Sequence, residues 1–413
     1  TPRNVIYNGN FKIYTRQILD IDNNLDTSKA NMPELASNMI PVYYDETEEV
    51  WKKADKYNSK EEYRWYSYES SGEYKGMWAN AVTVTETNRT TYLNATAGTA
   101  IPMDDINTMW VWIPRFNAVT PSNYNGGAKE SPGAIDVTFV NVNETAIDAF
   151  TFGNKELSGF WYAKFETSHS TLASSTTSNN LGCTNETCSN ANGIIIKPNV
   201  TSLKYNNISN FFYASRSMEQ TGNSFGFVSS DVDTHMSKNN EWGAVAYLTH
   251  SIYGRCTSST LCTEIGINNK QGHITGYGAP AGSNSSQTNG AYNTELGKNA
   301  STTRTIYGIY DMSGGAHEYV MGVYNNTISN SGFSSLPDEK YYNNYTVMGY
   351  SGHALTETQE WYWDAALYVE SGYPWYSRGG TFLDSSAAGV FYFGQANGGP
   401  GNFSSSRLVI SNE

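Results

Sequence analysis

The sequence predicts a mixed α+β fold with two helices, many short strands and long loops. Short segments in which apolar and polar residues alternate, most of them rich in aromatic side chains, recur along the chain. Tracts of Gly, Asn, Ser and Thr separate these segments, and such tracts are typical of turns and loops. Only two segments have apolar residues at the i, i+3 and i+4 spacing of a helix.

The chain divides by composition into two regions. Its 413 residues exceed the usual size of one small core, so a main domain with a smaller companion is expected. The most concentrated charge, DETEEVWKKADKYNSKEEYR at 45–64, lies among short aromatic segments. We therefore predict a small β-rich N-terminal module over residues 1–105 and a main domain over residues 106–413.

Strands and helices are predicted in both regions. The expected strands are at 42–44, 64–68, 76–84, 109–116, 135–140, 159–168, 390–393 and 408–410. One helix is predicted over 236–254, where Ser237 is the expected N-cap and Gly254 the expected stop. A shorter helix is predicted over 208–220.

Charge and composition exclude some classes of partner. The net charge is −13 and no Lys/Arg cluster interrupts it, so we expect no nucleic-acid partner. Charged residues make up only 16% of the chain and Tyr is abundant, which is typical of extracellular binding proteins. No apolar stretch is long enough for a membrane helix, and the N-terminus TPRNVIYNGNFK lacks the regions of a signal peptide. We expect a piece of a longer secreted or surface chain that contacts a membrane only through a separate anchor.

The four cysteines form two close pairs, Cys183 with Cys188 and Cys256 with Cys262. Each pair lies in loop sequence, which favours two local disulfides in an oxidising compartment. Free thiols or a metal site are the alternatives, but none of the six His residues lies at ligand spacing from these cysteines. Such short disulfide loops would stabilise the chain by about 2 kcal/mol each at most.

The segment YGIYDMSGGAHEYVMG at 307–322 is the most informative motif. Asp311, two glycines and Glu318 predict a tight turn whose oxygens could gather a hard cation such as Ca²⁺. The alternative is a structural turn, in which Asp311 caps backbone amides and Glu318 forms an internal hydrogen bond. No nucleophile elbow, P-loop or dinucleotide fingerprint occurs in the sequence.

Five ordered segments resemble the formylglycine-generating enzyme group, a variant of the C-type lectin fold. GIYDMSGGAHEYV resembles that group's G-L-Y-D-M-x-G-N-x-W-E-W segment, although Gly315 and His317 depart from it. The other segments are MWVWIPRF, GFWYAKFETS, NNEWGAVAYL and YSRGGTF, in the family's order over about residues 108–413. The resemblance implies a C-type lectin fold for the main domain.

The same resemblance bears on activity and on metal binding. Enzymes of that group activate oxygen on copper with a cysteine pair after the R-G-G motif, and this chain has no Cys after Cys262. We therefore expect a protein that is not an enzyme. The group's calcium site, carried over by position, would use the side chains of Asp311 and Glu318 and the carbonyls of Gly314 and Ala316. A structural calcium ion or no cofactor is expected.

A wider pattern consists of MIPVYYDE, IPMDDINTMWVWIPR, EWGAVAYLTHSIYG, IYDMSGGAHEYVMG and the terminal RGG, GVFYF and SSSRLVI blocks. This pattern resembles surface proteins of gut Firmicutes, and its end resembles the variable region of diversity-generating retroelement target proteins. In those proteins, mutagenic reverse transcription rewrites adenine-rich codons, and the fold displays the new residues on a ligand-binding surface. The resemblance implies a non-enzymatic variable protein at the cell or virion surface. Its binding region would span about residues 376–410, and its partner would be a protein or glycan on another surface.

This resemblance assigns roles within the terminal segment. The implied framework is Arg378, Gly379, Gly380, Gly389, Tyr392, Phe403, Arg407, Leu408 and Val409. The implied displayed, ligand-binding set is Tyr376, Leu383, Asp384, Phe391, Phe393, Gln395, Ala396, Asn397, Pro400 and Asn402. Because side chains alternate along a strand, Phe391 and Phe393 share one face, which is either an exposed aromatic patch or ordinary core.

Two other functions remain as alternatives. The high Tyr and Asn content equally suits a structural subunit or adhesin of a pilus, phage tail or surface layer. A divergent enzyme of the formylglycine-generating group would require a new cluster of His or carboxylate side chains in one cleft.

Overall fold

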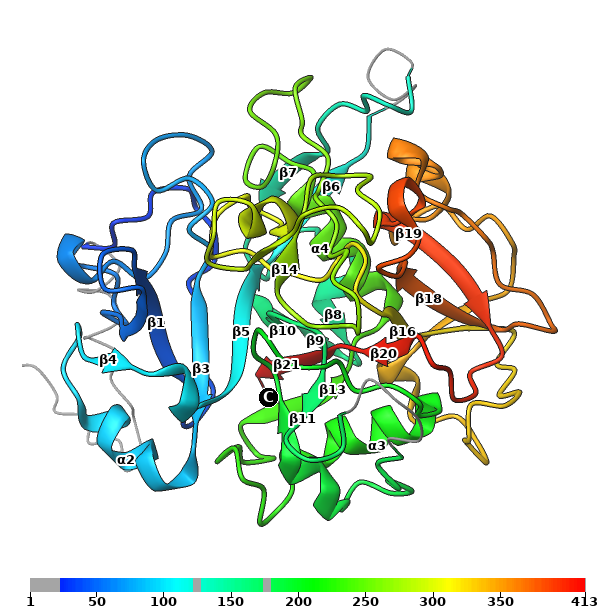
Figure 1. The fold of residues 1–413 in the computed structure, drawn as a ribbon, viewed down its shortest axis with the longest axis horizontal. Coiled ribbons are helices and arrows are strands. Elements are labelled where there is room, and N and C mark those ends of the chain that lie inside the picture. Colours follow the sequence, from blue (N-terminus) through cyan, green and yellow to red (C-terminus); the bar gives the residue numbers. More distant parts are fainter. Residues whose placement is uncertain (1–22, 122–127, 174–179, 413) are drawn as a thin grey trace, which may run out of the picture.

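Two β-sheets, with helices and long loops around them, form a mixed α+β fold (Figure 1). The computed structural model describes residues 23–121, 128–173 and 180–412. The first 22 residues of the predicted N-terminal module, and the N-terminal sequence searched for a signal peptide, lie outside these ranges. Within the described ranges, no helix combines the length and apolar character that crossing a bilayer requires.

The larger sheet has eight strands in the order β13-β21-β10-β5-β3-β1-β2-β4, and each neighbouring pair is antiparallel. Its strands are β1 (Ile40–Asp45), β2 (Val50–Lys53), β3 (Asn80–Val84), β4 (Ala100–Ile101), β5 (Ile106–Pro114), β10 (Gly159–Ala163), β13 (Val232–Met236) and β21 (Leu408–Asn412). Every residue of β5 except Asn107 is buried, because both faces of this central strand are covered. Trp112 of β5 lies opposite Trp161 of β10, with ring centroids 5.3 Å apart.

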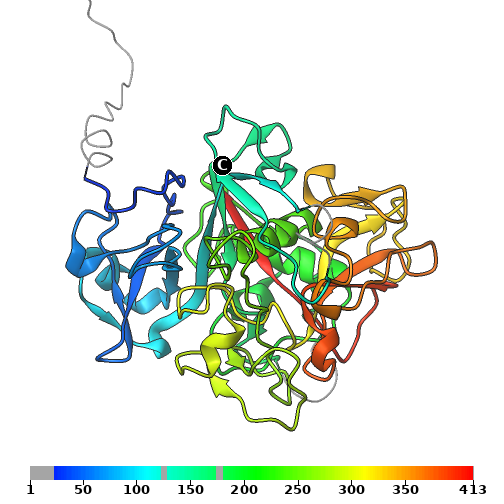
Figure 2. The same cartoon turned by 90° about the horizontal axis from the view of Figure 1, so that it is seen from above.

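The N-terminal strands extend this sheet. β3 pairs with β5, with Ala81 opposite Trp110, so the sheet continues across the predicted boundary at residues 105–106. Figures 1 and 2 show the blue and cyan N-terminal strands on one flank and the orange and red β18 and β19 on the other, while the last strand, β21, runs through the centre. The division into a module and a domain stays a prediction.

The predicted strand at 64–68 is replaced by irregular structure. Only Ser67 of this segment forms a β-bridge, with Met77. The backbone N–H of Trp65 instead donates to the Asn58 side chain at 2.8 Å. The alternation was therefore a sign of burial rather than of sheet pairing.

The described residues contain three α-helices, one more than predicted: α2 (Glu86–Asn94), α3 (Ile208–Ser217) and α4 (Asn239–Thr249). α2 was missed because it has no buried residue and therefore no apolar face. α4 is shorter than predicted and has Lys238, not Ser237, as its N-cap. The Glu241 carboxylate accepts the Lys238 N–H at 2.7 Å, which fixes the start of the helix.

The smaller sheet holds most of the C-terminal segment. Its strands are β16 (His317–Tyr324), β17 (Asn343–Tyr345), β18 (Trp375–Gly379), β19 (Gly389–Ala396) and β20 (Ser404–Ser406), in the order β17-β16-β18-β19 with β20 also on β16. Four two-stranded pairs complete the described strands: β6 (Phe116–Val119) with β7 (Asp136–Phe139), β8 (Thr151–Phe152) with β9 (Lys155–Glu156), β11 (Ser168–His169) with β12 (Ile194–Ile195), and β14 (Tyr277–Gly278) with β15 (Gly290–Ala291).

Arg407 joins the two sheets. It is the single residue between β20 of the smaller sheet and β21 of the larger one. Its buried guanidinium forms an ion pair with Glu318 of β16, where Nε lies 2.8 Å from a carboxylate oxygen. It also donates to the carbonyls of Ala163 at the end of β10 and Tyr310, at 2.8 and 3.0 Å. One side chain therefore ties the last strand to three other parts of the core.

We predict that Arg407→Met lowers the free energy of unfolding by about 3–5 kcal/mol, because it leaves the Glu318 carboxylate buried without its partner. Urea unfolding measures this loss. Arg407→Met combined with Glu318→Leu should cost less than the two single changes added together, since no charge is then stranded.

Lys298→Met is the matched control for this pair. It breaks pairs with the exposed Glu46 and Glu295 and should cost about 1 kcal/mol or less. Equal losses for Arg407→Met and Lys298→Met, or additive single changes at Arg407 and Glu318, would contradict the proposed role of the buried pair.

Candidate ligand-binding surface

Three aromatic residues of the predicted displayed set are core residues. Tyr376, Phe391 and Phe393 each have an exposed fraction of 0%. The rings of Phe391 and Trp361 lie 5.0 Å apart, and those of Tyr376 and Phe393 lie 6.1 Å apart. The prediction that these side chains face solvent is therefore wrong, because the face shared by Phe391 and Phe393 packs inward.

The other predicted positions lie nearer the solvent. Leu383 is 53% exposed, and Pro400 and Asn402 are also exposed. Asp384, Gln395, Ala396 and Asn397 are half-buried. Seven of the implied framework residues are buried: Arg378, Gly379, Gly380, Gly389, Arg407, Leu408 and Val409. The other two implied framework residues are less buried, since Tyr392 of β19 is half-buried and Phe403 is 42% exposed, and their framework role stays a prediction.

Five residues form one continuous surface, which we call the terminal surface: His317, Leu383, Asp384, Tyr392 and Phe403. His317 is at its centre, with Nε2 3.9 Å from an oxygen of Asp384 and its ring 5.5 Å from the Tyr392 ring. The His317 backbone N–H donates to the Phe403 carbonyl at 2.7 Å. Pro400 and Asn402 precede Phe403 on the same loop.

Buried aromatic rings support this surface from below. The His273 ring lies 5.4 Å from Phe403 and 4.8 Å from Phe382, which directly precedes Leu383. Burial lowers the pKa of His273 to about 4. Burial also lowers the pKa of His317, and the Asp384 carboxylate offsets part of that shift. Both imidazoles are therefore neutral at pH 7, and the surface offers apolar groups, neutral donors and acceptors, and one carboxylate.

Asp364 fixes the start of β19, a role that was not predicted from the sequence. One of its carboxylate oxygens accepts the Phe391 backbone N–H at 2.9 Å. A side chain at Gly389 would meet the same carboxylate at 2.0 Å, so only glycine fits there. Desolvation by burial raises the pKa of Asp364 well above its usual range. The segment WYWDAALYV has one acid among apolar residues, which was the available signal for a buried carboxyl group.

The turn at 307–322 is held together by protein groups. Asp311 accepts hydrogen bonds from the Asn268 side chain and the Gly276 backbone, at 2.8 and 2.9 Å. Glu318 binds Arg407, and the buried Glu166 carboxylate accepts the Ala316 N–H at 2.7 Å. A side chain at Gly315 would meet that Glu166 carboxylate at 2.3 Å, which explains the glycine.

These contacts match the structural alternative for the turn and do not fit the implied calcium set. The Arg407 guanidinium already lies against Glu318, so a cation bound there would meet a positive charge. Gly314 is held by its own N–H, which donates to the Gly379 carbonyl at 3.0 Å. Calcium at Asp311, Gly314, Ala316 and Glu318 stays a prediction that these contacts do not support.

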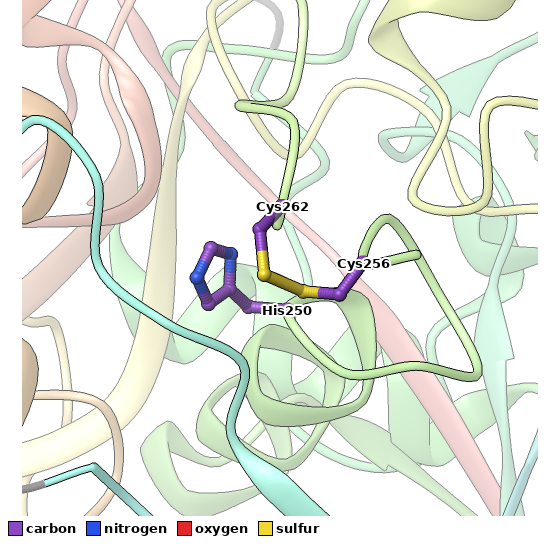
Figure 3. Close-up of side chains that lie close together, drawn as sticks. All are labelled: His250, Cys256 and Cys262. Carbon is purple, nitrogen blue, oxygen red and sulfur yellow. A yellow bond between two sulfur atoms is a disulfide. The ribbon is translucent and has the colours of Figure 1, made fainter. Parts of the chain in front are cut away.

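The structure confirms both predicted disulfides, Cys183–Cys188 and Cys256–Cys262. It also places His250 beside the second one, a contact that the spacing of the residues did not indicate (Figure 3). The two sulfurs are bonded to each other and are not thiolate ligands, so this group is not a metal centre in the oxidised protein. The His250 ring packs against Phe391 at 5.4 Å, below β19.

Comparison with known proteins finds weak likenesses of structure. No protein-family model matches the sequence, and no curated protein matches it. Treponema denticola variable protein 1 is 12% identical, with 76% of this chain and 97% of that chain covered and a TM-score of 0.30. The Major Tropism Determinant U1 variant is 13% identical, with 81% and 72% covered and a TM-score of 0.27.

We predict that the stability of Asp364→Asn, measured relative to that of the parent protein, increases as the pH rises. Because the folded-state pKa is raised, the native protein keeps a proton that the unfolded chain releases. The stability from this group is therefore present below its unfolded pKa of about 4 and is lost at higher pH. Asn does not titrate, so the variant's free energy of unfolding relative to the parent protein should rise by about 1 kcal/mol or more between pH 5 and pH 8.

Urea unfolding at the two pH values measures this change. Asp104→Asn, at an exposed position, is the matched control and should show no such rise. A constant difference between Asp364→Asn and the parent protein would show that Asp364 is ionised in the native state.

Proposed function

We propose that the protein is a non-enzymatic binding protein whose terminal surface recognises a protein or glycan on another surface. The observation that carries this proposal is the exposure of two large apolar side chains, Leu383 at 53% and Phe403 at 42%, in the two segments that contact His317. Exposed apolar groups beside polar ones are typical of recognition surfaces. The terminal surface has both apolar and polar side chains in the segments around His317.

The loop that carries part of this surface is held at several points. Backbone N–H groups of Tyr205, Ile208 and Asn330 donate to the carbonyls of Gly401, Gly398 and Asn397, at 3.1, 3.2 and 3.0 Å. The Tyr319 hydroxyl donates to the Gly399 carbonyl at 2.8 Å. A loop fixed in this way loses little conformational entropy when a ligand binds, which favours affinity.

The finer proposal is a C-type lectin fold of the formylglycine-generating type, diversified at its end by a retroelement. Its support is the ordered set of sequence segments, two of which, NNEWGAVAYL and YSRGGTF, meet at α4. Trp242, from NNEWGAVAYL, donates to the Val390 carbonyl at 3.0 Å. Arg378, from YSRGGTF, lies with its guanidinium 5.6 Å from the Trp242 ring.

An extracellular or virion-surface location belongs to the same proposal. Its support is the pair of disulfides, since such bonds persist in oxidising compartments. Attachment to a membrane would use an anchor outside the described residues.

Random substitution distinguishes displayed from structural positions. In a surface-display library of the whole chain, variants at Leu383, Asp384, Pro400, Asn402 and Phe403 should mostly remain folded. A control library at Tyr376, Phe391 and Phe393 should mostly unfold, because truncating a buried aromatic costs about 3–5 kcal/mol. Protease resistance and thermal unfolding of sampled clones measure both.

The same surface library tests recognition directly. Selection against hen egg lysozyme as a probe should yield binders whose affinity is lost when the selected residues revert. The proposal of an adaptable binding surface is contradicted if the surface library unfolds like the core library, or if the folded library yields no binder.

The retroelement proposal makes a separate genomic prediction. A reverse transcriptase gene should lie beside the coding region, with an imperfect copy of the segment that encodes residues 376–410. The two copies should differ only where the template has adenine, and the differences should fall at exposed positions such as Leu383 and Asn402. Sequencing the locus decides this, and a copy that differs at other bases, or no copy at all, leaves the binding proposal without the retroelement.

A further inference from the structure

A cleft lies at the N-terminal end of the larger sheet, and none of the terminal-surface residues lines it. β1 pairs with β3 only at residues 40–42 and continues to Asp45 with β2 alone. In place of β3, the Tyr307 hydroxyl binds both the N–H and the carbonyl of Tyr44, each at 3.2 Å. The space beside Tyr307 is a cleft of about 460 Å³, within the usual range for small-molecule sites. We call it the N-terminal cleft.

Four tyrosines line the N-terminal cleft: Tyr43, Tyr44, Tyr74 and Tyr307. Tyr74 is held under the Arg64 guanidinium, which lies 4.2 Å from the ring centroid. Arg64 is fixed in turn by an ion pair with Glu61 at 2.6 Å. The cleft therefore has aromatic faces in defined positions, so a ligand would not have to order them.

Charged groups of both signs also line this cleft. Five glutamates and four basic residues are present, among them Lys298, which pairs with Glu46 at 3.2 Å and Glu295 at 3.1 Å. The lining therefore has nearly balanced charge, with carboxylates that accept hydrogen bonds and ammonium and guanidinium groups that donate them.

We propose that the N-terminal cleft binds a neutral saccharide. An anionic ligand would meet five carboxylates on a protein of net charge −13, and a polycation would meet four basic groups. A neutral sugar avoids both costs. Its hydroxyls match both the donors and the acceptors of the lining, and its C–H faces pack on the tyrosine rings.

Titration of the whole protein with defined probes tests this proposal. The probes are the neutral trisaccharides maltotriose, cellotriose and chitotriose, with spermidine as the cationic and citrate as the anionic comparison. Calorimetry or NMR should detect at least one trisaccharide with a Kd at or below about 1 mM, a typical weak affinity. Failure of all three trisaccharides, or tighter binding of spermidine or citrate, overturns the proposal.

Variants locate the binding. Tyr74→Ala should weaken the bound trisaccharide about tenfold, as expected for the loss of one aromatic contact. Glu73→Gln, at an exposed position of the cleft lining, removes one charge without removing a ring. Its affinity for the trisaccharide is a second measure of binding in the N-terminal cleft. Tyr373→Ala, which truncates a tyrosine that is 50% exposed and outside the cleft, is the matched control and should bind like the parent protein.

Two further comparisons keep the outcomes separate. Thermal unfolding of Tyr74→Ala shows whether its fold is intact. If it is not, the affinity of Glu73→Gln for the trisaccharide decides whether the sugar binds in the N-terminal cleft. Leu383→Ala with Phe403→Ala alters the terminal surface and should leave saccharide binding unchanged. Equal losses for Tyr74→Ala and Tyr373→Ala, or loss of saccharide binding in the terminal-surface variant, would show that the sugar does not bind in the N-terminal cleft.

Discussion

The buried pair of Arg407 and Glu318 is the constraint on which the arrangement of the two sheets depends. Arg407 is the only residue between β20 and β21, so the chain passes from one sheet to the other at this side chain. A buried guanidinium requires a carboxylate and carbonyls in fixed positions, and here they come from β16, from the end of β10 and from the turn at Tyr310. The end of the chain is therefore held in place on both sides of Arg407, in β20 and in β21.

This constraint explains why a tract with the composition of a loop, residues 397–403, lies between two core strands. The tract begins where β19 ends and finishes at β20, directly before Arg407, so both of its ends are fixed. Glycines let it follow a tight path, as at Gly398, where a side chain would lie 2.8 Å from the Trp375 ring. Asn402 and Phe403 of this tract are exposed. The composition of the tract is typical of a flexible loop, but its position in the fold is fixed at both ends.

The sequence indicated the elements better than it indicated the faces. The alternation in β19 correctly paired Phe391 with Phe393, and the local spacing of the cysteines was sufficient to predict both disulfides. Which face of β19 is inside depends on Trp361 and His250, which come from distant segments and carry no local signal. The partner of Glu318 lies 89 residues further along the chain, so the turn at 307–322 could not be distinguished from a cation site by its own residues.

The two proposed sites share one covalently continuous and largely buried frame, so their separation is fixed. β1, β3, β5, β10 and β21 are neighbours in one sheet, and Arg407 connects that sheet to the strands beneath the terminal surface. If a target surface presents both a saccharide and a second epitope at a matching distance, the first contact raises the effective concentration for the second. A weak, unchanging saccharide site would then add avidity to whatever the terminal surface recognises. A rigid frame favours this coupling only at one spacing, which restricts the targets that both sites can bind together.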